Sequence, residues 1–482
     1  MSTETAVLTD FAGTRSTEVH GCGATACCDP RTPCHRFIFL GFLCFLSFGV
    51  YFCYDNPAAL QETILADMSI NKESFMNLYA WYSWPSVIMA MSGGFLIDRV
   101  FGVRLSAIIF ASFITLGQVI FGLGAYLQKF WVMEAGRCVF GLGGETLAVA
   151  QNTYAAAWFK DKELNMVFGL QLSMARIGST VNMNIMQPVY QRFARVYKEP
   201  YGDGYKTLGY ALFFGVIFCL FSLSISLTLA FLDKRANRIL RRDDAKTGEI
   251  IRLKDIKEFP FSCWLIFIIC VMYYVSVFSF IDLGLVFFMS KYGFTHSQAS
   301  VCNSLVYLIS AAASPFFGFI VDRTGRSLYW LMFSIMMTLL SHALLALTFI
   351  TPFVAMSIMG VFYSLLACSL WPLIPNEVPA HQTGTAYGLM QSLQNLGLGV
   401  CAIAAGKIVD NSGYLMLEVF FCICLCVAML AAVALYFWDS AKGRGLNLSA
   451  KEKKKAKAKE IAEKQKAVND SASYEQKPLI TN

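Results

Sequence analysis

Long apolar stretches alternate with short polar segments along nearly the whole chain, and their spacing predicts membrane-spanning helices. A helix needs about 20 consecutive apolar residues to cross a bilayer. The first six stretches of that kind cover residues 37–58, 74–97, 105–128, 131–158, 164–188 and 206–232. The second six cover residues 261–289, 297–321, 327–350, 354–378, 384–409 and 413–438. We therefore expect an all-α membrane protein with twelve transmembrane helices.

The same polar turn interrupts this pattern once in each half of the chain. The first is Gly94-Phe-Leu-Ile-Asp98-Arg99, followed by Gly102 and Arg104. The second is Gly318-Phe-Ile-Val-Asp322-Arg323-Thr-Gly-Arg326, and the first copy carries one extra residue before its second glycine. A repeated helix end, glycine turn and helix start indicates an internal duplication, which is common in secondary transporters. The sequence predicts two pseudo-symmetric six-helix bundles, residues 37–232 and 261–438.

Charge outside the apolar stretches predicts the orientation of the chain. Most of the 39 lysines and arginines fall in an N-terminal tail (1–36), a central linker (233–260), a basic C-terminal tail (439–482) and the turns on the same side. Positive charge favours the cytosolic side, so both termini are expected there. The net charge of +7 then reflects topology and contact with anionic lipids of the bilayer, and nucleic-acid binding is not expected.

The sixteen cysteines do not indicate disulfides, because none falls within an expected loop on the far side of the membrane. Cys22, Cys27, Cys28 and Cys34 cluster in the N-terminal tail without the CxxC-type spacing of a zinc site. Palmitoylation or plain reduced thiols fit this cluster better. The chain contains no recognisable catalytic triad, phosphate loop or metal cluster, so we expect neither an enzyme nor a bound cofactor or metal.

Two opposite charges fall deep within the expected helices. Glu145 and Arg176 each lie about 20 Å from the cytosolic end of neighbouring antiparallel helices, at a rise of ~1.5 Å per residue. One alternative is a salt bridge that clamps the two helices together. The other is that both side chains face a central cavity and hold a substrate with separated opposite charges. We favour the second, because intramembrane ions in transporters usually mark the substrate pathway.

The surroundings of Arg176 recur in the second half, where the charge is missing. Residues 168–178 align with 387–397, and Arg176 aligns with Asn395. The expected cavity is therefore asymmetric, with its ions in the N-terminal half. Asn303 and Asn395 can hydrogen-bond a substrate, although each can equally bridge two helices. Asp282 and Glu418 are further acids in or near the membrane without an evident partner.

Several aromatic residues are candidates for the cavity wall. Tyr54, close to Pro57, and Tyr82 can line it, although anchoring at the membrane surface or packing is the more common role of such residues. Tyr273 and Trp371 are candidates in the second half. For Trp371, a cavity wall and a packing role between helices are equally consistent with the sequence.

The paired turns, together with Arg137-x-x-x-Gly141-x-Gly143 in the fourth helix, resemble the signature of the major facilitator superfamily. Longer strings, including FCYDNPAALQ (52–61), YAWYSWP (79–85) and FGLQLSMARIGSTVNMN (168–184), resemble the lysosomal dipeptide uniporters of that superfamily. This resemblance implies passage of dipeptides from lumen to cytosol by alternating access, without proton or sodium coupling. It also implies that the turns, through Asp98, Arg99, Asp322, Arg323 and Arg326, close the cytosolic side in the outward-open form.

A division of labour between the two charges follows. Arg176 would bind the C-terminal carboxylate of a dipeptide as a guanidinium fork, and Glu145 would bind the N-terminal ammonium. Two rival functions remain open at this point. One is a proton-coupled symporter of peptides or small carboxylates, with Glu145 as the proton carrier. The other is a membrane scaffold or sensor that does not transport.

The resemblance further implies a partner, a heavily glycosylated single-span lysosomal membrane protein that shields the carrier. Asn-x-Ser/Thr sequons occur only at Asn447 and Asn469, both in the expected cytosolic tail, so the chain has no lumenal glycan of its own. Glu475, Leu479 and Ile480 fit an acidic dileucine signal, which adaptor proteins bind. We therefore expect a multi-pass protein of the lysosomal membrane, with a plasma or endosomal membrane as the alternative.

Overall fold

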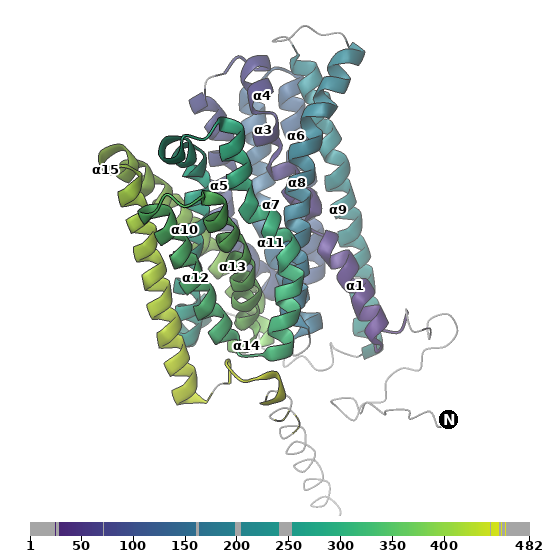
Figure 1. Ribbon diagram of the computed structural model, residues 1–482. Helices are drawn as coiled ribbons and strands as arrows, with labels where there is room; N and C mark the ends of the chain where they lie inside the picture. Colours follow the sequence, from purple (N-terminus) through teal and green to yellow (C-terminus); the bar gives the residue numbers. More distant parts are fainter. Residues whose placement is uncertain are drawn as a thin grey trace, which may run out of the picture.

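The protein is described here from a computed structural model. The structure describes residues 25, 28–70, 72–160, 163–197, 204–240, 253–443 and 445–452, together with 455 and 458. Within these residues the secondary structure is helical apart from one isolated bridge between Gly325 and Ser449. Figure 1 shows long helices standing side by side in two groups, one purple to teal and one green to yellow.

The first half contains six long helical passages joined by short turns. They are α1 (Pro33–Phe45) continued by α2 (Phe48–Tyr54), α5 (Lys72–Leu96), α6 (Gly102–Tyr126), α7 (Phe130–Phe159), α8 (Leu164–Tyr197) and α9 (Tyr205–Leu240). The short helices α3 (Asn56–Ala59) and α4 (Gln61–Asp67) follow the first passage. A π-helical turn, η2 (Ile97–Phe101), joins α5 to α6 and absorbs the extra residue of the first Asp-Arg turn.

The second half repeats this arrangement. Its helices are α10 (Phe261–Tyr292), α11 (His296–Thr324), α12 (Ser327–Leu347), α13 (Pro352–Leu370), the short α14 (Ile374–Glu377), and α15 (Thr383–Lys442), with short 3-10 turns at Leu253–Glu258, Trp371–Leu373 and Ala380–Gln382. Helix α15 is two helices joined at Gly413, which has a left-handed φ of 75°. The described residues thus contain the expected twelve long passages.

Hydropathy separates these passages into two kinds. By length and composition, eight helical stretches of the described residues could cross a membrane, and one of them, Asn77–Tyr126, covers most of α5 and all of α6. Helices α7, α8 and the first part of α15 are absent from this set. These are the helices that carry Glu145, Arg176 and Asn395, so the less apolar passages are those expected to line a polar cavity.

Several helix ends differ from the expected ranges. The first passage breaks near Ser47 and again at Asp55, rather than running unbroken to residue 58. Helix α8 extends beyond residue 188 to Tyr197, with Pro188 inside it. Helix α9 continues past the expected start of the linker to Leu240, because Asp233 is bonded to Arg104 Nε at 2.6 Å and to Trp158 Nε1 at 2.8 Å. These bonds keep that part of α9 packed against α6 and α7.

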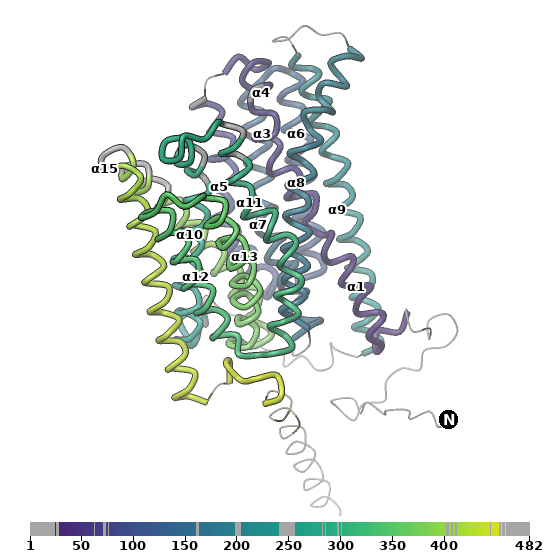
Figure 2. Tube along the Cα trace, in the orientation of Figure 1, coloured from purple at the N-terminus to yellow at the C-terminus, as the bar shows by residue number. Residues whose placement is uncertain are grey.

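The two halves meet along two seams, α5 against α15 and α8 against α11. Glycines bring the backbones into contact: a Cβ on Gly388 would lie 2.3 Å from Ala90 O, and one on Gly169 would lie 2.3 Å from Ser314 O. Neither seam could be this close with a larger residue at these positions. The start of α1 and residues 445–452 lie at the same end of the molecule, which we call the tail end (Figure 2).

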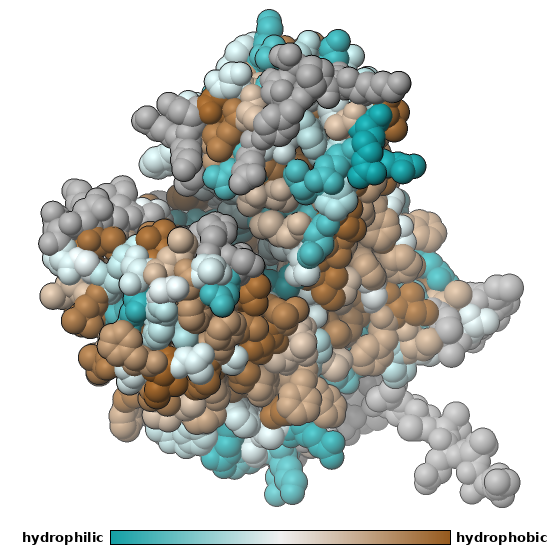
Figure 3. Space-filling model, turned by 45° about the horizontal axis from the view of Figure 1, so that its top comes forward, coloured by the Kyte–Doolittle hydropathy of each residue, from teal (hydrophilic) through white to brown (hydrophobic). Residues whose placement is uncertain are grey.

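The opposite end, which we call the far end, is open between the halves. Figure 3, turned so that this end comes forward, shows a hollow between the two groups of helices with apolar flanks on the outside. Large apolar side chains are exposed around the outer surface, including Phe316, Ile217 and Phe437 at 61%, 58% and 65%. Such a belt is what a lipid-facing surface requires.

Candidate functional site

Glu145 is positioned by the close packing of α7 against α5. A Cβ on Gly141 would lie 2.3 Å from Tyr82 O, and one on Gly144 would lie 2.8 Å from the Tyr82 hydroxyl. The two glycines therefore allow the Tyr82 ring to lie directly on α7. Its hydroxyl donates to Glu145 Oε1 at 3.1 Å. Glu145 as a residue is partly exposed, unlike the glycines on either side of this contact, which are buried.

Arg176 reaches from α8 into aromatic side chains of the second half. Its Nη2 donates to the Tyr363 hydroxyl at 2.5 Å, and the guanidinium carbon lies 4.4 Å from the centre of the Tyr307 ring. The Phe278 ring lies at 5.8 Å on another side. Arg176 Nε is buried without a hydrogen-bond partner in the described residues, so the fork retains donor capacity for an anion.

The two charges are not bonded to each other in this conformation. No ion pair joins Glu145 and Arg176, whose charges are held by Tyr82 and Tyr363 instead. Tyr51 of α2 interacts electrostatically with both Glu145 and Arg176, so the two charged side chains belong to one region of the molecule. In this conformation the structure thus contains no salt bridge between Glu145 and Arg176, and their roles toward a substrate stay a prediction.

The second half supplies an aromatic wall. Trp371 Nε1 donates to the Tyr274 hydroxyl at 2.8 Å, and Tyr387 donates to Trp371 O at 3.2 Å. The rings of Tyr274 and Tyr363 lie 6.0 Å apart at a near-perpendicular angle. Trp371 is therefore held in place by hydrogen bonds at both its ring and its backbone, and is connected through Tyr274 to the residue that binds Arg176.

The two adjacent tyrosines of α10, Tyr273 and Tyr274, have different surroundings. Tyr273 is completely buried and exchanges a 2.9 Å hydrogen bond with Thr338 of α12, so it belongs to the core of the second half. Its neighbour Tyr274 is part of the aromatic wall, because its hydroxyl accepts the hydrogen bond from Trp371. The sequence analysis missed Tyr307 and Tyr363. Helical spacing contained a signal for both, since Tyr307 lies one turn after Asn303 and Tyr363 two turns before Trp371.

The two candidate asparagines differ in their surroundings. Asn303 donates from Nδ2 to Ile281 O at 2.7 Å and therefore bridges α11 to α10, as the alternative interpretation held. Asn395 lies on α15 and is partly exposed, with no hydrogen-bond partner among the described residues. It remains a candidate for ligand contact, whereas the bridging bond restricts Asn303.

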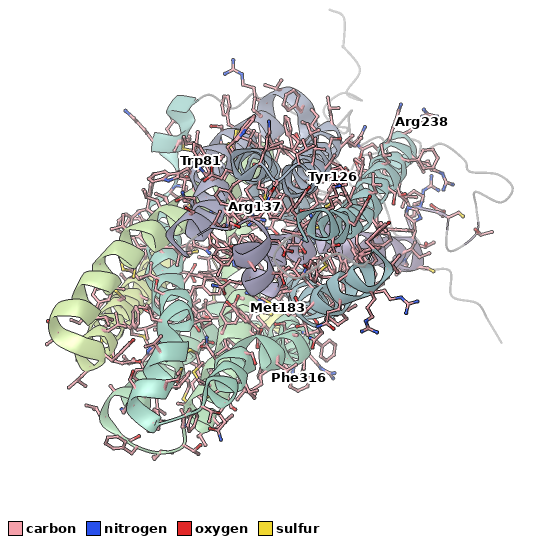
Figure 4. The ribbon with its side chains drawn as sticks, turned by 90° about the horizontal axis from the view of Figure 1, so that it is seen from above. Trp81, Tyr126, Arg137, Met183, Arg238 and Phe316 are labelled. Carbon is pink, nitrogen blue, oxygen red and sulfur yellow. The ribbon has the colours of Figure 1, made fainter. Side chains whose placement is uncertain are left out.

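Tyr54 is held in the site by Arg137. This arginine is 1% exposed, and its guanidinium donates to the backbone oxygens of Leu78, Cys53 and Tyr54 at 3.3, 3.4 and 3.2 Å. Two of these carbonyls, those of Cys53 and Tyr54, lie at the end of α2, where the helix breaks at Asp55. The Tyr54 ring then packs against Tyr82 at 4.8 Å. Figure 4, seen from above, places Arg137 among the helices of the first half.

Each Asp-Arg turn binds the start of a helix in the opposite half. Asp98 accepts from Gly384 N, Thr385 N and Thr385 Oγ1 at 3.1, 2.6 and 2.8 Å, at the first turn of α15. Asp322 accepts from Asn165 N, Asn165 Nδ2 and Met166 N at 3.2, 2.6 and 2.7 Å, at the first turn of α8. A carboxylate at a helix N-terminus satisfies free N–H groups and interacts favourably with the helix dipole.

Among the described residues, the arginines of the turns make no comparable contact between the halves. Arg99 lies over the Phe95 ring of its own helix at 5.5 Å, and Arg326 lies over Tyr329 at 5.6 Å. Arg323 is exposed. In this conformation the two aspartates, rather than the arginines, join the halves at the tail end.

A buried ionisable pair in the second half lies outside the candidate site. His342 Nδ1 of α12 and Glu418 Oε2 of α15 are 2.7 Å apart, with side chains 0% and 1% exposed. The sequence analysis left Glu418 without a partner, and the structure supplies one. Among the described residues, no group of three or more histidine, cysteine or acidic side chains could hold a metal ion.

Comparison with known proteins gives this geometry its context. The chain is 60% identical to the lysosomal dipeptide transporter MFSD1 of Danio rerio over 394 residues, covering 82% of this chain and 85% of that protein. It is 57% identical to the lysosomal dipeptide transporter MFSD1 of Homo sapiens over 396 residues, covering 82% and 84%.

Solved structures share the fold at low identity. The fucose transporter FucP in the outward conformation superposes with a TM-score of 0.62 at 14% identity, covering 83% of this chain and 99% of that one. The human organic anion transporter MFSD10 gives a TM-score of 0.59 at 12% identity, covering 84% and 100%. The family model of the Major Facilitator Superfamily matches residues 38–402. The chain belongs to the Major Facilitator Superfamily and is a membrane transporter.

Proposed function

We propose that this transporter carries dipeptides from the lysosomal lumen to the cytosol by alternating access, as a uniporter. The observation that carries the proposal is the separation of Glu145 from Arg176 within one region, each held by a tyrosine and neither neutralised by the other. Relatives of this chain at 57–60% identity are lysosomal dipeptide transporters. The site and the relatives therefore support the same substrate class.

A dipeptide offers charges that match the site. At the pH of the lumen or the cytosol it carries an ammonium at one end and a carboxylate at the other, up to about 7 Å apart when extended. Glu145 would accept hydrogen bonds from the ammonium, and the free Arg176 Nε would bind the carboxylate together with Nη2. Both contacts are to main-chain groups, so side chains of different size can be accommodated against Trp371 and Asn395.

The conformation suggests which side of the membrane the site opens to. Both seams are closed at the tail end, and both aspartates of the turns join the halves there. We propose that the tail end is cytosolic and that Asp98 and Asp322 act as latches of the lumen-open form. Substrate binding and closure at the far end would compensate for opening these contacts.

The C-terminal tail carries the features that concern location and partners. Glu475, Leu479 and Ile480, which lie outside the described residues, would bind adaptor proteins and direct the chain to lysosomes. A glycosylated single-span accessory protein would shield the lumenal side, since the only sequons of this chain are in its C-terminal tail. Leu479→Ala with Ile480→Ala should move the protein to the cell surface, and unchanged lysosomal imaging of the double variant would place the signal elsewhere.

Purified protein in proteoliposomes tests the transport step. A zwitterionic dipeptide should be taken up down its gradient without an imposed pH or sodium gradient, and it should raise the melting temperature of the protein in detergent. Current or internal acidification that accompanies uptake would instead support the proton-coupled alternative. Absence of both uptake and thermal stabilisation across a dipeptide library would contradict the substrate class.

A further inference from the structure

The chain reverses direction immediately after α15. Gly443 and Gly445 have φ of 61° and 81°, in the left-handed region that glycine adopts readily. Asp439, itself 6% exposed, then accepts from Leu446 N at 2.9 Å and from Asn447 N at 3.1 Å. Leu446 is 4% exposed. The reversal is therefore fixed by hydrogen bonds and burial, and residues 445–452 form a defined segment that we call the strap.

The strap lies along the turn between α11 and α12. Arg326 N donates to Leu448 O at 3.1 Å, and Gly325 pairs with Ser449 in an antiparallel bridge. A Cβ on Gly325 would lie 2.6 Å from both Leu448 O and Ala450 N, so the two backbones are in direct contact. Figure 2 shows this yellow segment beneath the green helices at the tail end.

The end of the strap is stabilised by a reciprocal cap. Ser449 N donates to Glu452 Oε2 at 2.8 Å, and Glu452 N donates to Ser449 Oγ at 3.3 Å, as in a capping box. These bonds hold the pKa of Glu452 below its usual range, and the nearby charges of Arg326 and Lys455 act in the same direction. The strap is thus ordered at both of its ends.

The turn that the strap contacts is under conformational constraint. Arg326 has a left-handed φ of 55°, which is unfavourable for a residue with a side chain and persists only when its surroundings fix it. The same turn carries Asp322, whose carboxylate binds the start of α8 in the other half. The strap therefore contacts the outer side of the turn, while the inner side joins the two bundles.

We propose that the strap is a built-in clamp that holds the α11–α12 turn in the conformation in which Asp322 binds α8, and so stabilises the form closed at the tail end. Among the described residues, no segment of the tails or the linker pairs in this way with the turn between α5 and α6. The clamp acts on one of the two latches, and its release would shift the carrier toward the form open at the tail end. The proposal rests on alternating access, but its test does not depend on the substrate.

Cys368 is a native reporter of this equilibrium. It is completely buried on α13, and its thiol donates to Ser314 O at 3.3 Å at the seam between α8 and α11. A Cβ on Gly169 of the opposite half would lie 3.2 Å from its sulfur. Separation of the halves at the tail end would expose this thiol. Cys34 is exposed and serves as the internal reference for labelling.

Two truncated chains form a matched pair for the experiment. One ends at Gly443 and lacks the strap; the other ends at Glu452 and retains it, so both lack the basic tail beyond. Alkylation of Cys368 relative to Cys34 is measured by peptide mass spectrometry on the purified, substrate-free proteins. Without the strap the relative rate should rise roughly fivefold, which corresponds to the loss of about one hydrogen bond. The chain ending at Glu452 should match the full chain.

A second variant covers the case in which the shorter chain fails to fold. Asp439→Asn in the full chain weakens the acceptor of Leu446 N and Asn447 N while leaving the strap in place. It should raise Cys368 alkylation by a smaller factor in the same direction, with the melting temperature nearly unchanged. Equal alkylation in the strap-less and strap-containing proteins, or an unchanged rate in Asp439→Asn, would overturn the clamp. Neither result would bear on whether dipeptides are carried.

Discussion

The two seams at the tail end differ from the hollow between the bundles at the far end, which we call the cleft. The contacts of the two halves are equivalent in the seams but not in the cleft. Along the seams the two halves repeat each other contact by contact. Ser173 Oγ donates to Ala311 O at 2.6 Å, and its counterpart Ser392 donates to Val87 O at 2.7 Å. Asp322 caps α8 as Asp98 caps α15. In the cleft between the bundles both charges, Glu145 and Arg176, come from the first half, whereas aromatic rings come from both halves.

This difference separates the mechanism of movement from the recognition of substrate. Two equivalent seams that close and open together are what a rocking motion of two bundles requires. A ligand with different ends needs different partners, so the cleft has lost the symmetry. Changes in the seams should therefore shift the conformational equilibrium for any substrate, whereas changes in the cleft should affect binding while leaving the resting conformation intact.

The largest effect is expected from removing the charges of the cleft. Arg176→Ala and Glu145→Gln should each reduce dipeptide uptake by more than about 30-fold, since losing one partner of a charged contact costs about 2–5 kcal/mol. Uptake into proteoliposomes and melting temperature are the measurements. Both variants should fold, because neither charge is paired with the other. A neutral double variant that transports at the wild-type rate would remove these residues from the site.

Glycines of the seams should give the next largest effect. Gly388→Ala and Gly169→Ala each place a Cβ 2.3 Å from a backbone oxygen of the opposite half, so the helices must separate. Overpacking of this kind costs about 1–3 kcal/mol. Because separation of the halves at the tail end would relieve this clash, Cys368 alkylation should increase in both variants. Gly41→Ala, where no atom lies within 4 Å, is the control.

The two latches should then behave alike. Asp98→Asn and Asp322→Asn each keep the side-chain size but remove the charge at a helix N-terminus, which is worth about 0.5–2 kcal/mol. Each should make Cys368 more reactive without loss of folding. If only one of the pair changes the reactivity, the seams are not equivalent and the remaining aspartate merely caps its helix.

The smallest effect should come from the aromatic wall. Tyr363→Phe removes the hydrogen bond to Arg176 but retains the ring, and a bond to a charged group contributes about 1.5–3 kcal/mol at most. Because Arg176 is partly exposed and can bond water or substrate in place of the hydroxyl, the expected loss is a few-fold rise in KM at unchanged maximal rate. Tyr273→Phe, which loses a bond inside the core, should leave KM unaltered and lower the melting temperature instead.

The sequence by itself determined much of this protein. Apolar length and positive charge predict twelve passages and two halves, because a bilayer admits only helices long enough to cross it. The depth of Glu145 and Arg176 follows from helical rise alone, and the turns at Asp98 and Asp322 follow from the repeat. Each of these features depends on local spacing along the chain, which is why a single sequence contains it.

Tertiary structure decided which groups meet. That Tyr274 and not Tyr273 bonds Trp371 depends on the rotation of α10 about its axis, and the nearly uniform apolar surface of that helix leaves no pattern to fix the rotation. The pairing of Glu418 with His342, the approach of Arg176 to Tyr363 and the docking of the strap on Gly325 join residues far apart in the chain. Such contacts arise only when helices from both halves pack, so no local pattern predicts them.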